Sequence, residues 1–167
     1  MITRDFLGND WNIGCMGCDI ANLSMQVPGG FIKRSRHFCV HQDPLIPLPG
    51  FLVIASLRHM RSIDEMNGAE YEDFSRLLRD AQRAIKDTVK VESLSIIQEE
   101  HSIHFHLWFF PWAGALIQQH GPPSLTSIRG IMAGYRREPI GAGEWQELEK
   151  TIENIRSRMD EMEGLHG

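Results

Sequence analysis

Two histidines stand one residue apart in the most strongly patterned segment of the chain, residues 102–110. Because side chains alternate across a β-strand, this segment predicts a strand that presents both imidazoles on a face away from the core. The side chains expected on the core face are Ile103, Phe105, Leu107 and Phe109, and those expected on the other face are Ser102, His104, His106 and Trp108. Such a histidine pair suits metal binding or catalysis, and it is equally compatible with a structural role.

A second group able to do chemistry is the pair Cys15 and Cys18, which two residues separate. A C-x-x-C pair can be redox-active, supply half of a zinc site, or be incidental. The redox interpretation needs a βαβ unit, and the Gly- and Asn-rich surroundings do not favour one. A structural zinc ion takes four nitrogen or sulfur ligands, so the pair needs two more. The imidazoles in predicted structured positions are His59 and His104.

Several strands must position these groups. Residues 31–40 predict two short strands that turn near Ser35, and residues 43–50 hold three prolines and predict a loop. Residues 51–57 and 94–98 predict further strands. Together with the histidine strand, they indicate an antiparallel sheet with helices packed on it, which is an α+β fold.

Apolar residues at three- and four-residue steps predict two long helices. The first covers residues 68–89, with an apolar face of Tyr71, Phe74, Leu78, Ala81, Ile85 and Val89. The apolar stripe of the second helix runs from Trp145 to Met162, and the helix ends at Gly164. This apolar stripe either packs on the core of its own domain or forms the interface of a dimer. Residues 122–135 predict a further short helix.

Length and composition narrow the possible classes of protein. The chain has 167 residues, 42% of them hydrophobic and 23% charged, which suits one globular domain with a core. The net charge of −5 provides no basic surplus for a nucleic acid duplex or an anionic membrane. Three cysteines do not make a disulfide framework, and neither a signal peptide nor a membrane span is evident. We therefore expect a soluble, cytoplasmic protein.

The sequence resembles the histidine-triad (HIT) superfamily in three segments that follow the family's order. The segment HFHLWFFP, from His104 to Pro111, is similar to the signature His-φ-His-φ-His-φ-φ-Pro. The segment DPLIPLPGFLVIASLRH, from Asp43 to His59, is similar to the family's Asp-x-x-Pro…Pro-Gly-His-x-Leu-Val-Ile-Pro-Lys-x-His. The Cys15-x-x-Cys18-x-Ile20 segment resembles its N-terminal Cys-x-x-Cys-x-Ile. The match spans residues 13–112, so we expect a HIT-like nucleotide-binding domain over 1–112 and a C-terminal helical extension of the same domain over 113–167.

This resemblance implies a HIT-like fold with about five antiparallel strands, commonly in a homodimer, that binds a nucleotide. The family's middle histidine attacks the α-phosphorus of a nucleoside phosphate derivative, which assigns that role to His106. Neutral imidazole is nucleophilic without a separate base, provided that a backbone carbonyl holds its other nitrogen as N–H. The implied substrates are diadenosine polyphosphates or nucleoside phosphoramidates, in a hydrolase or a transferase.

The resemblance also implies roles in ligand binding. Zinc-bearing relatives, including galactose-1-phosphate uridylyltransferases, use positions that correspond to Cys15, Cys18, His59 and His104 as a structural Zn²⁺ site. Asp43 corresponds to the residue that binds ribose hydroxyls, although an aspartate before Pro44 could instead cap a turn. Further candidates for nucleotide binding are Gln98, Ser102 and Trp108, the last as a stacking surface or a packing residue.

Four departures from the family pattern affect the expected chemistry. Trp108 replaces the third histidine, and its indole has one N–H and no proton to transfer readily. Phe51 replaces the histidine of the second motif, and Trp112 stands where an arginine often follows the proline. The turn before the signature is shortened to Glu99-Glu100-His101, whose carboxylates would repel phosphate.

The leading hypothesis is a zinc-containing nucleotide hydrolase or transferase. The alternative is a nucleotide-binding regulatory module with little turnover. A third hypothesis, a zinc-stabilised interaction module, leaves His106 unexplained.

Overall fold

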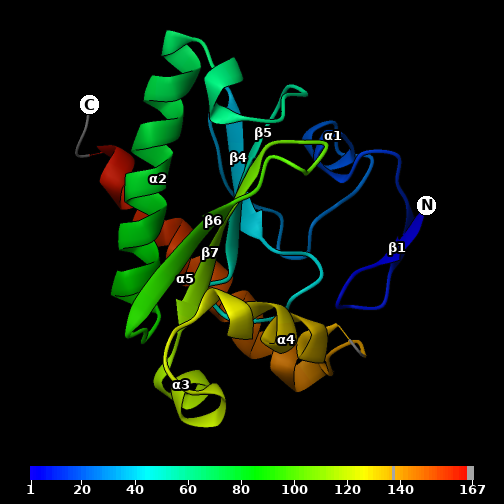
Figure 1. Ribbon diagram of the computed structural model, residues 1–167, viewed down its shortest axis with the longest axis vertical. Helices are drawn as coiled ribbons and strands as arrows, with labels where there is room; N and C mark the ends of the chain where they lie inside the picture. The colour runs from blue at the N-terminus through cyan, green and yellow to red at the C-terminus, as the bar shows by residue number, and fades with distance from the viewer. Residues whose placement is uncertain (137, 165–167) are drawn as a thin grey trace.

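The computed structural model describes residues 1–136 and 138–164. A five-stranded sheet with the spatial order β3–β4–β5–β7–β6 forms its centre (Figure 1). The strands are β3 (Phe31–Arg34), β4 (Phe38–Gln42), β5 (Leu52–Ser56), β6 (Ser93–Gln98) and β7 (His106–Trp112). Every neighbouring pair is antiparallel. The predicted α+β fold with about five antiparallel strands is therefore confirmed.

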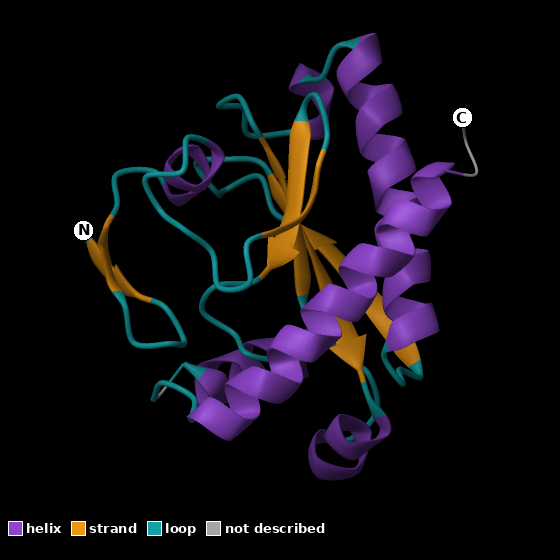
Figure 2. Cartoon of the chain, turned by 180° about the vertical axis from the view of Figure 1, so that it is seen from behind, coloured by secondary structure: helices purple, strands orange, loops and turns teal. Residues whose placement is uncertain are grey.

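Two long helices, α2 (Gly68–Thr88) and α5 (Ala142–Gly164), cover one face of this sheet (Figure 2). Both helices share a single hydrophobic core with sheet residues such as Phe38 and Ile54. The apolar stripe of α5 is buried in that core, so the helix docks on its own domain. Within the described residues, no helix combines the length and the apolar composition needed to cross a bilayer.

The remaining elements lie at the other face and at one end of the sheet. The hairpin of β1 (Ile2–Arg4) and β2 (Asp10–Asn12) and the helix α1 (Met16–Ala21) lie on the side away from α2 (Figure 1). The 3-10 helix η1 (Ile63–Glu65) follows β5, while α3 (Gly114–His120) and α4 (Leu125–Tyr135) follow β7. The sequence indicates a loop-rich N-terminus and does not locate β1, β2 or α1, because such short elements show no usable periodicity.

The predicted apolar face of α2 is partly wrong. Phe74, Ala81 and Ile85 are buried as expected, but Tyr71 is 54% exposed. Leu77 is buried in the core and Leu78 only packs against its edge. Two adjacent leucines fit an amphipathic helix equally well from the sequence, and the packing against α5 decides which one turns inward.

The histidine strand begins four residues later than predicted, at His106, because residues 99–105 form a turn. The N–H of Phe105 donates to the carbonyl of Met60 at 2.6 Å, so the chain here is held by the segment after β5 rather than by β6. Phe105 is still fully buried, whereas Ile103 is 55% exposed instead of facing the core. His104 therefore lies in the turn and His106 on the strand.

Helix α2 begins with a capping box. The side chain of Asn67 accepts the N–H of Glu70 at 3.0 Å, and Glu70 Oε2 accepts the N–H of Asn67 at 2.9 Å. Arg58 Nη2 also donates to Glu70 at 2.9 Å. The hydrogen bond from Arg58, and then the one from Asn67, lower the pKa of Glu70 to about 2.

We expect Glu70→Gln to lower the free energy of unfolding at neutral pH by about 1 kcal/mol, because it weakens both contacts. Since folding lowers the pKa of Glu70 from 4.5 to about 2, the carboxylate stabilises the protein above pH 4.5 and loses this effect as the pH falls towards 2. Urea unfolding at several pH values should show the difference from the parent protein shrinking in acid. The exposed Glu72→Gln is the matched control, and a pH-independent difference would contradict the assignment.

Candidate functional site

Strand register builds the floor of the site. The pairings of β4 with β5 and of β5 with β7 align side chains in two rows on the sheet face that α1 covers. The first row is Cys39, Ala55 and His106, and the second is His41, Val53 and Trp108. Neighbours in a row share one face of the sheet. The rings of His106 and Trp108 consequently lie 5.2 Å apart between centroids.

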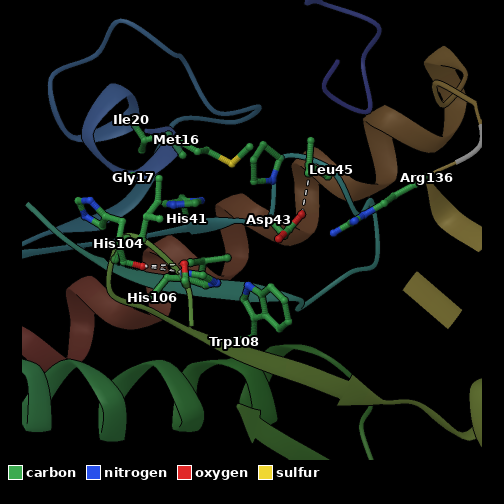
Figure 3. A pocket seen from close by; sticks show the side chains of 15 residues that line it. Met16, Gly17, Ile20, His41, Asp43, Leu45, His104, His106, Trp108 and Arg136 are labelled. Carbon is green, nitrogen blue, oxygen red and sulfur yellow. Dashed lines mark hydrogen bonds between the residues drawn. The ribbon is translucent and has the colours of Figure 1, made fainter. Parts of the chain in front are cut away.

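This floor lies under a cavity of about 250 Å³ (Figure 3). Its walls come from α1, from the loop after β4, from the turn before β7 and from the end of α4. The residues that these four segments contribute include Met16, Ile20, Leu45, Ser102 and Arg136. Segments far apart in the sequence thus surround His106.

The ring of His106 is held in one tautomer. Its Nδ1 lies 3.0 Å from the carbonyl oxygen of His104 and 3.3 Å from Oγ of Ser102. Because a carbonyl oxygen only accepts hydrogen bonds, Nδ1 carries the proton and the neutral ring keeps its lone pair on Nε2. This tautomer leaves Nε2 free to act as a nucleophile.

Four side chains that could ligate a metal converge beside this ring. The ligand atoms of Cys15, Cys18, His59 and His104 all lie within 4.8 Å of one another. Sγ of Cys15 lies 3.8 and 3.5 Å from Nδ1 of His59 and His104, and the corresponding distances from Cys18 are 3.3 and 3.4 Å. Tetrahedral zinc, with bonds of about 2.3 Å to sulfur and 2.05 Å to nitrogen, separates such atoms by about 3.6 Å. The cluster therefore fits a tetrahedral metal ion.

The surroundings of His104 favour metal binding through Nδ1. Its Nε2 lies 2.8 Å from the carbonyl oxygen of Ser56, so this nitrogen carries the proton and Nδ1 keeps the lone pair. Burial lowers the pKa of His104, which favours the neutral ring. Among the protein groups alone, burial and then Cys15 raise the pKa of the Cys18 thiol to about 11. A bound cation would offset this by stabilising the thiolate.

His104 links the two centres. Its imidazole belongs to the cysteine–histidine cluster, while its own carbonyl oxygen accepts a hydrogen bond from Nδ1 of His106. A shift of the His104 backbone would therefore move the carbonyl group that fixes the His106 tautomer.

Gly17 lets α1 approach His104. A Cβ at position 17 would lie 2.3 Å from Cδ2 and 2.4 Å from Cγ of the imidazole. We expect Gly17→Ala to displace this ring and to weaken metal affinity about 10-fold or more. Competition with a chromophoric chelator measures the change. Gly14→Ala is the control, because nothing lies within 4 Å of a Cβ there. Equal affinities for the two variants would contradict the steric argument.

Asp43 lies at the rim of the cavity and is buried. Its Oδ1 accepts the N–H groups of Leu45 and Ile46 at 2.8 and 2.9 Å, so the turn-capping contact is present. Its Oδ2 has no hydrogen-bond partner within the described part of the chain, which leaves it available to a ligand hydroxyl. Burial raises the pKa of Asp43, and the charge of Arg136 opposes that shift.

Arg136, at the C-terminal end of α4, is a residue that sequence reasoning missed. Figure 3 shows its guanidinium directed towards Asp43 across the cavity. The guanidinium forms no hydrogen bond or ion pair with residues 1–136 or 138–164, so it can contact an anionic ligand. No local motif marks this arginine, because only the packing of α4 brings it to the site. Arg136 thus supplies a positive charge at the cavity, which Trp112, at the position where an arginine often follows the proline, does not.

Solved structures share this architecture. A hypothetical histidine triad nucleotide-binding protein from Sulfolobus tokodaii aligns over 89% of this chain and 93% of its own, with 16% identity and a TM-score of 0.62. The chain has the HIT fold. A Zn-bound histidine triad family protein from Mycobacterium smegmatis aligns over 91% and 97% of the two chains, with 13% identity and a TM-score of 0.62. A Hit-like protein involved in cell-cycle regulation from Bartonella henselae covers 89% and 98%, with 11% identity and a TM-score of 0.62. No protein-family model and no curated protein sequence matches the chain.

On this HIT fold, two of the unusual aromatic residues belong to the core. Phe51 and Trp112 are fully buried among residues of α3 and α4, and Trp112 Nε1 donates to Oγ of Ser95 at 2.9 Å. Trp108 differs from them because it is half-buried and lines the cavity next to His106. Of these three aromatic residues, only Trp108 can meet a ligand.

The structure separates the remaining polar candidates. Ser102 lines the cavity and donates to the carbonyl of His104 at 3.1 Å, so it helps to hold the peptide that positions His106. Gln98 is not brought to the cavity: it pairs with Leu107, whose side chain packs in the α2 core. In the acidic turn, Glu99 forms an ion pair with Arg129 at 3.0 Å, which reduces the expected repulsion of phosphate.

Proposed function

We propose that this chain is a nucleotide hydrolase or nucleotidyl transferase that acts at the α-phosphate of a nucleoside phosphate derivative through His106. The observation that carries the proposal is the ring of His106 at the cavity, with Nδ1 3.0 Å from a backbone carbonyl oxygen, an arrangement that in the neutral ring places the lone pair on Nε2. Asp43 Oδ2 would accept hydrogen bonds from ribose hydroxyls, and Arg136 would contact the phosphate chain. The HIT fold agrees with this assignment.

The proposed reaction has two displacements at phosphorus. Nε2 of His106 attacks the α-phosphorus, an N–P bond forms, and the bond from phosphorus to the leaving group breaks with its electron pair. Water, or a phosphorylated acceptor in a transferase, then attacks the same phosphorus. The N–P bond breaks, the acceptor loses its proton to solvent, and the neutral imidazole is restored.

Trp108 favours one class of leaving group. An amine leaving from a phosphoramidate needs a proton, and the indole N–H next to His106 does not supply one. A phosphate or nucleotide leaves as a stable anion. Of the two implied classes, we therefore propose dinucleoside polyphosphates as better substrates than phosphoramidates.

We further propose that the ion held by Cys15, Cys18, His59 and His104 is a structural Zn²⁺. Four protein ligands leave no position for a reacting water, so the ion would stabilise the attachment of α1 to the end of β5 and the turn before β7. The homodimer implied by the resemblance and the cytoplasmic location expected from the sequence stay predictions. Light scattering on the purified protein tests the first of them.

A regulatory module that binds nucleotide with little turnover is the second candidate. Trp108 favours it, because the group that contacts phosphate in relatives is replaced by a side chain with no transferable proton.

Trapping the intermediate distinguishes the two functions. Protein incubated with α-³²P-labelled diadenosine polyphosphate is quenched and digested, and the labelled peptide is sequenced. We expect an acid-labile adduct on His106 and released nucleoside monophosphate. Nucleotide binding without adduct or product would instead support the regulatory module.

A further inference from the structure

One buried hydrogen-bond acceptor in the cavity is not used by the proposed chemistry. His41, on β4, is 1% exposed and lines the cavity, two residues before Asp43. Its Nε2 is buried and has no hydrogen-bond partner among the described residues. Leaving a buried polar atom unpaired is unfavourable, so this nitrogen is a candidate contact for a ligand.

The hydrogen bonds of His41 define what Nε2 can do. Nδ1 lies 2.8 Å from the carbonyl oxygen of Gln42, so Nδ1 carries a proton. Burial lowers the pKa of His41 to about 4, so the ring is neutral at pH 7. Nε2 is then a pure acceptor, and a partner must bring a donor.

The walls near His41 restrict the chemistry of that partner. The cavity that His41 lines is bordered by the apolar side chains of Met16 and Ile20 from α1, Leu45 from the loop, and Val53, which pairs with His41 from β5. A neutral imidazole does not attract phosphate, and the charged groups Asp43 and Arg136 lie together on another side of the cavity (Figure 3). The His41 side of the cavity thus suits a flat, uncharged heterocycle that carries one donor.

We propose that His41 selects the nucleobase by accepting a hydrogen bond from an exocyclic amino group, as carried by adenine and cytosine. This inference rests on the proposed nucleotide function. A base with a carbonyl in the same place would set two lone pairs against each other, and a base with only hydrogen there would leave Nε2 unpaired.

The test measures binding of ligand pairs that differ only in the amino group, to the metal-loaded protein by calorimetry. The pairs are AMP with purine riboside 5′-monophosphate, and CMP with its 4-deamino analogue. We expect the amino ligand of at least one pair to bind about 10-fold or more tightly than its partner. Which pair shows the effect identifies the base.

Variants separate the role of His41 from general packing. We expect His41→Phe to reduce the preference to about 2-fold or less, while His120→Phe, the same substitution at an exposed imidazole that does not line the cavity, keeps it. Equal binding within both pairs to the parent protein would overturn the role of His41 but not nucleotide binding. If none of the four ligands binds, the proposed function and this inference both fall. The comparison on the parent protein stands even if His41→Phe does not fold.

Discussion

His106→Ala is expected to lower turnover of a dinucleoside polyphosphate by about 10³-fold or more, because it removes the nitrogen that attacks phosphorus. Nucleotide affinity should change much less, since Asp43, His41 and Arg136 still line the cavity. Steady-state kinetics and calorimetry on the same preparation separate the two effects. The variant should also lose the trapped adduct.

The control is His120→Ala, which removes an exposed imidazole at the end of α3. It should retain the parent turnover, and thermal unfolding should show that both variants are folded. Turnover by His106→Ala within about 10-fold of the parent would exclude His106 as the nucleophile. Turnover absent from the parent protein as well, with nucleotide bound, would favour the regulatory module.

The second large effect concerns the metal. Replacing Cys15 and Cys18 together by serine should abolish binding of about one zinc ion per chain and lower the free energy of unfolding by about 4 kcal/mol or more. The loss of folded structure should begin at α1, which has six residues and no side-chain cap at its N-terminus. A helix this short is unstable by itself.

Because α1 carries Met16 and Ile20 of the cavity wall, the double variant should also bind nucleotide more weakly. Metal analysis, urea unfolding, hydrogen exchange of α1 and nucleotide-binding calorimetry measure the four effects. Cys39→Ala is the control, since this buried cysteine lies outside the cluster and should leave the metal content unchanged. A metal-free double variant with the stability and exchange protection of the parent would show that the cluster holds no structural ion.

The sequence predicted the elements whose side chains repeat with a clear period. The sheet, α2 and α5 were found because alternation and amphipathic stripes extend over many residues. The cysteine–histidine cluster was also predicted, because the cysteine pair needs two more ligands and His59 and His104 are the imidazoles in predicted structured positions. The division of the domain at residue 112 stays a prediction, although α5 shares the core of α2.

The remaining features depended on tertiary contacts that a single sequence does not display. The start of β7 was misplaced because Phe105 bonds to Met60 rather than to β6. Gln98 was selected for its polarity, but strand register turns it towards the core face. Arg136 and His41 carry no motif, and only the packing of α4 and the pairing of β4 with β5 bring them to the cavity.

The double use of His104 has a thermodynamic consequence. If an ion on its imidazole holds the peptide that orients His106, and if α1 must be in place for nucleotide to bind, the two ligands are coupled. Coupling free energy is reciprocal, so nucleotide must increase the affinity for metal by the same factor by which metal increases the affinity for nucleotide. At a given chelator concentration, protein filled with nucleotide should therefore retain more of its ion at equilibrium than the free protein, and metal supply would set the fraction of molecules competent to bind.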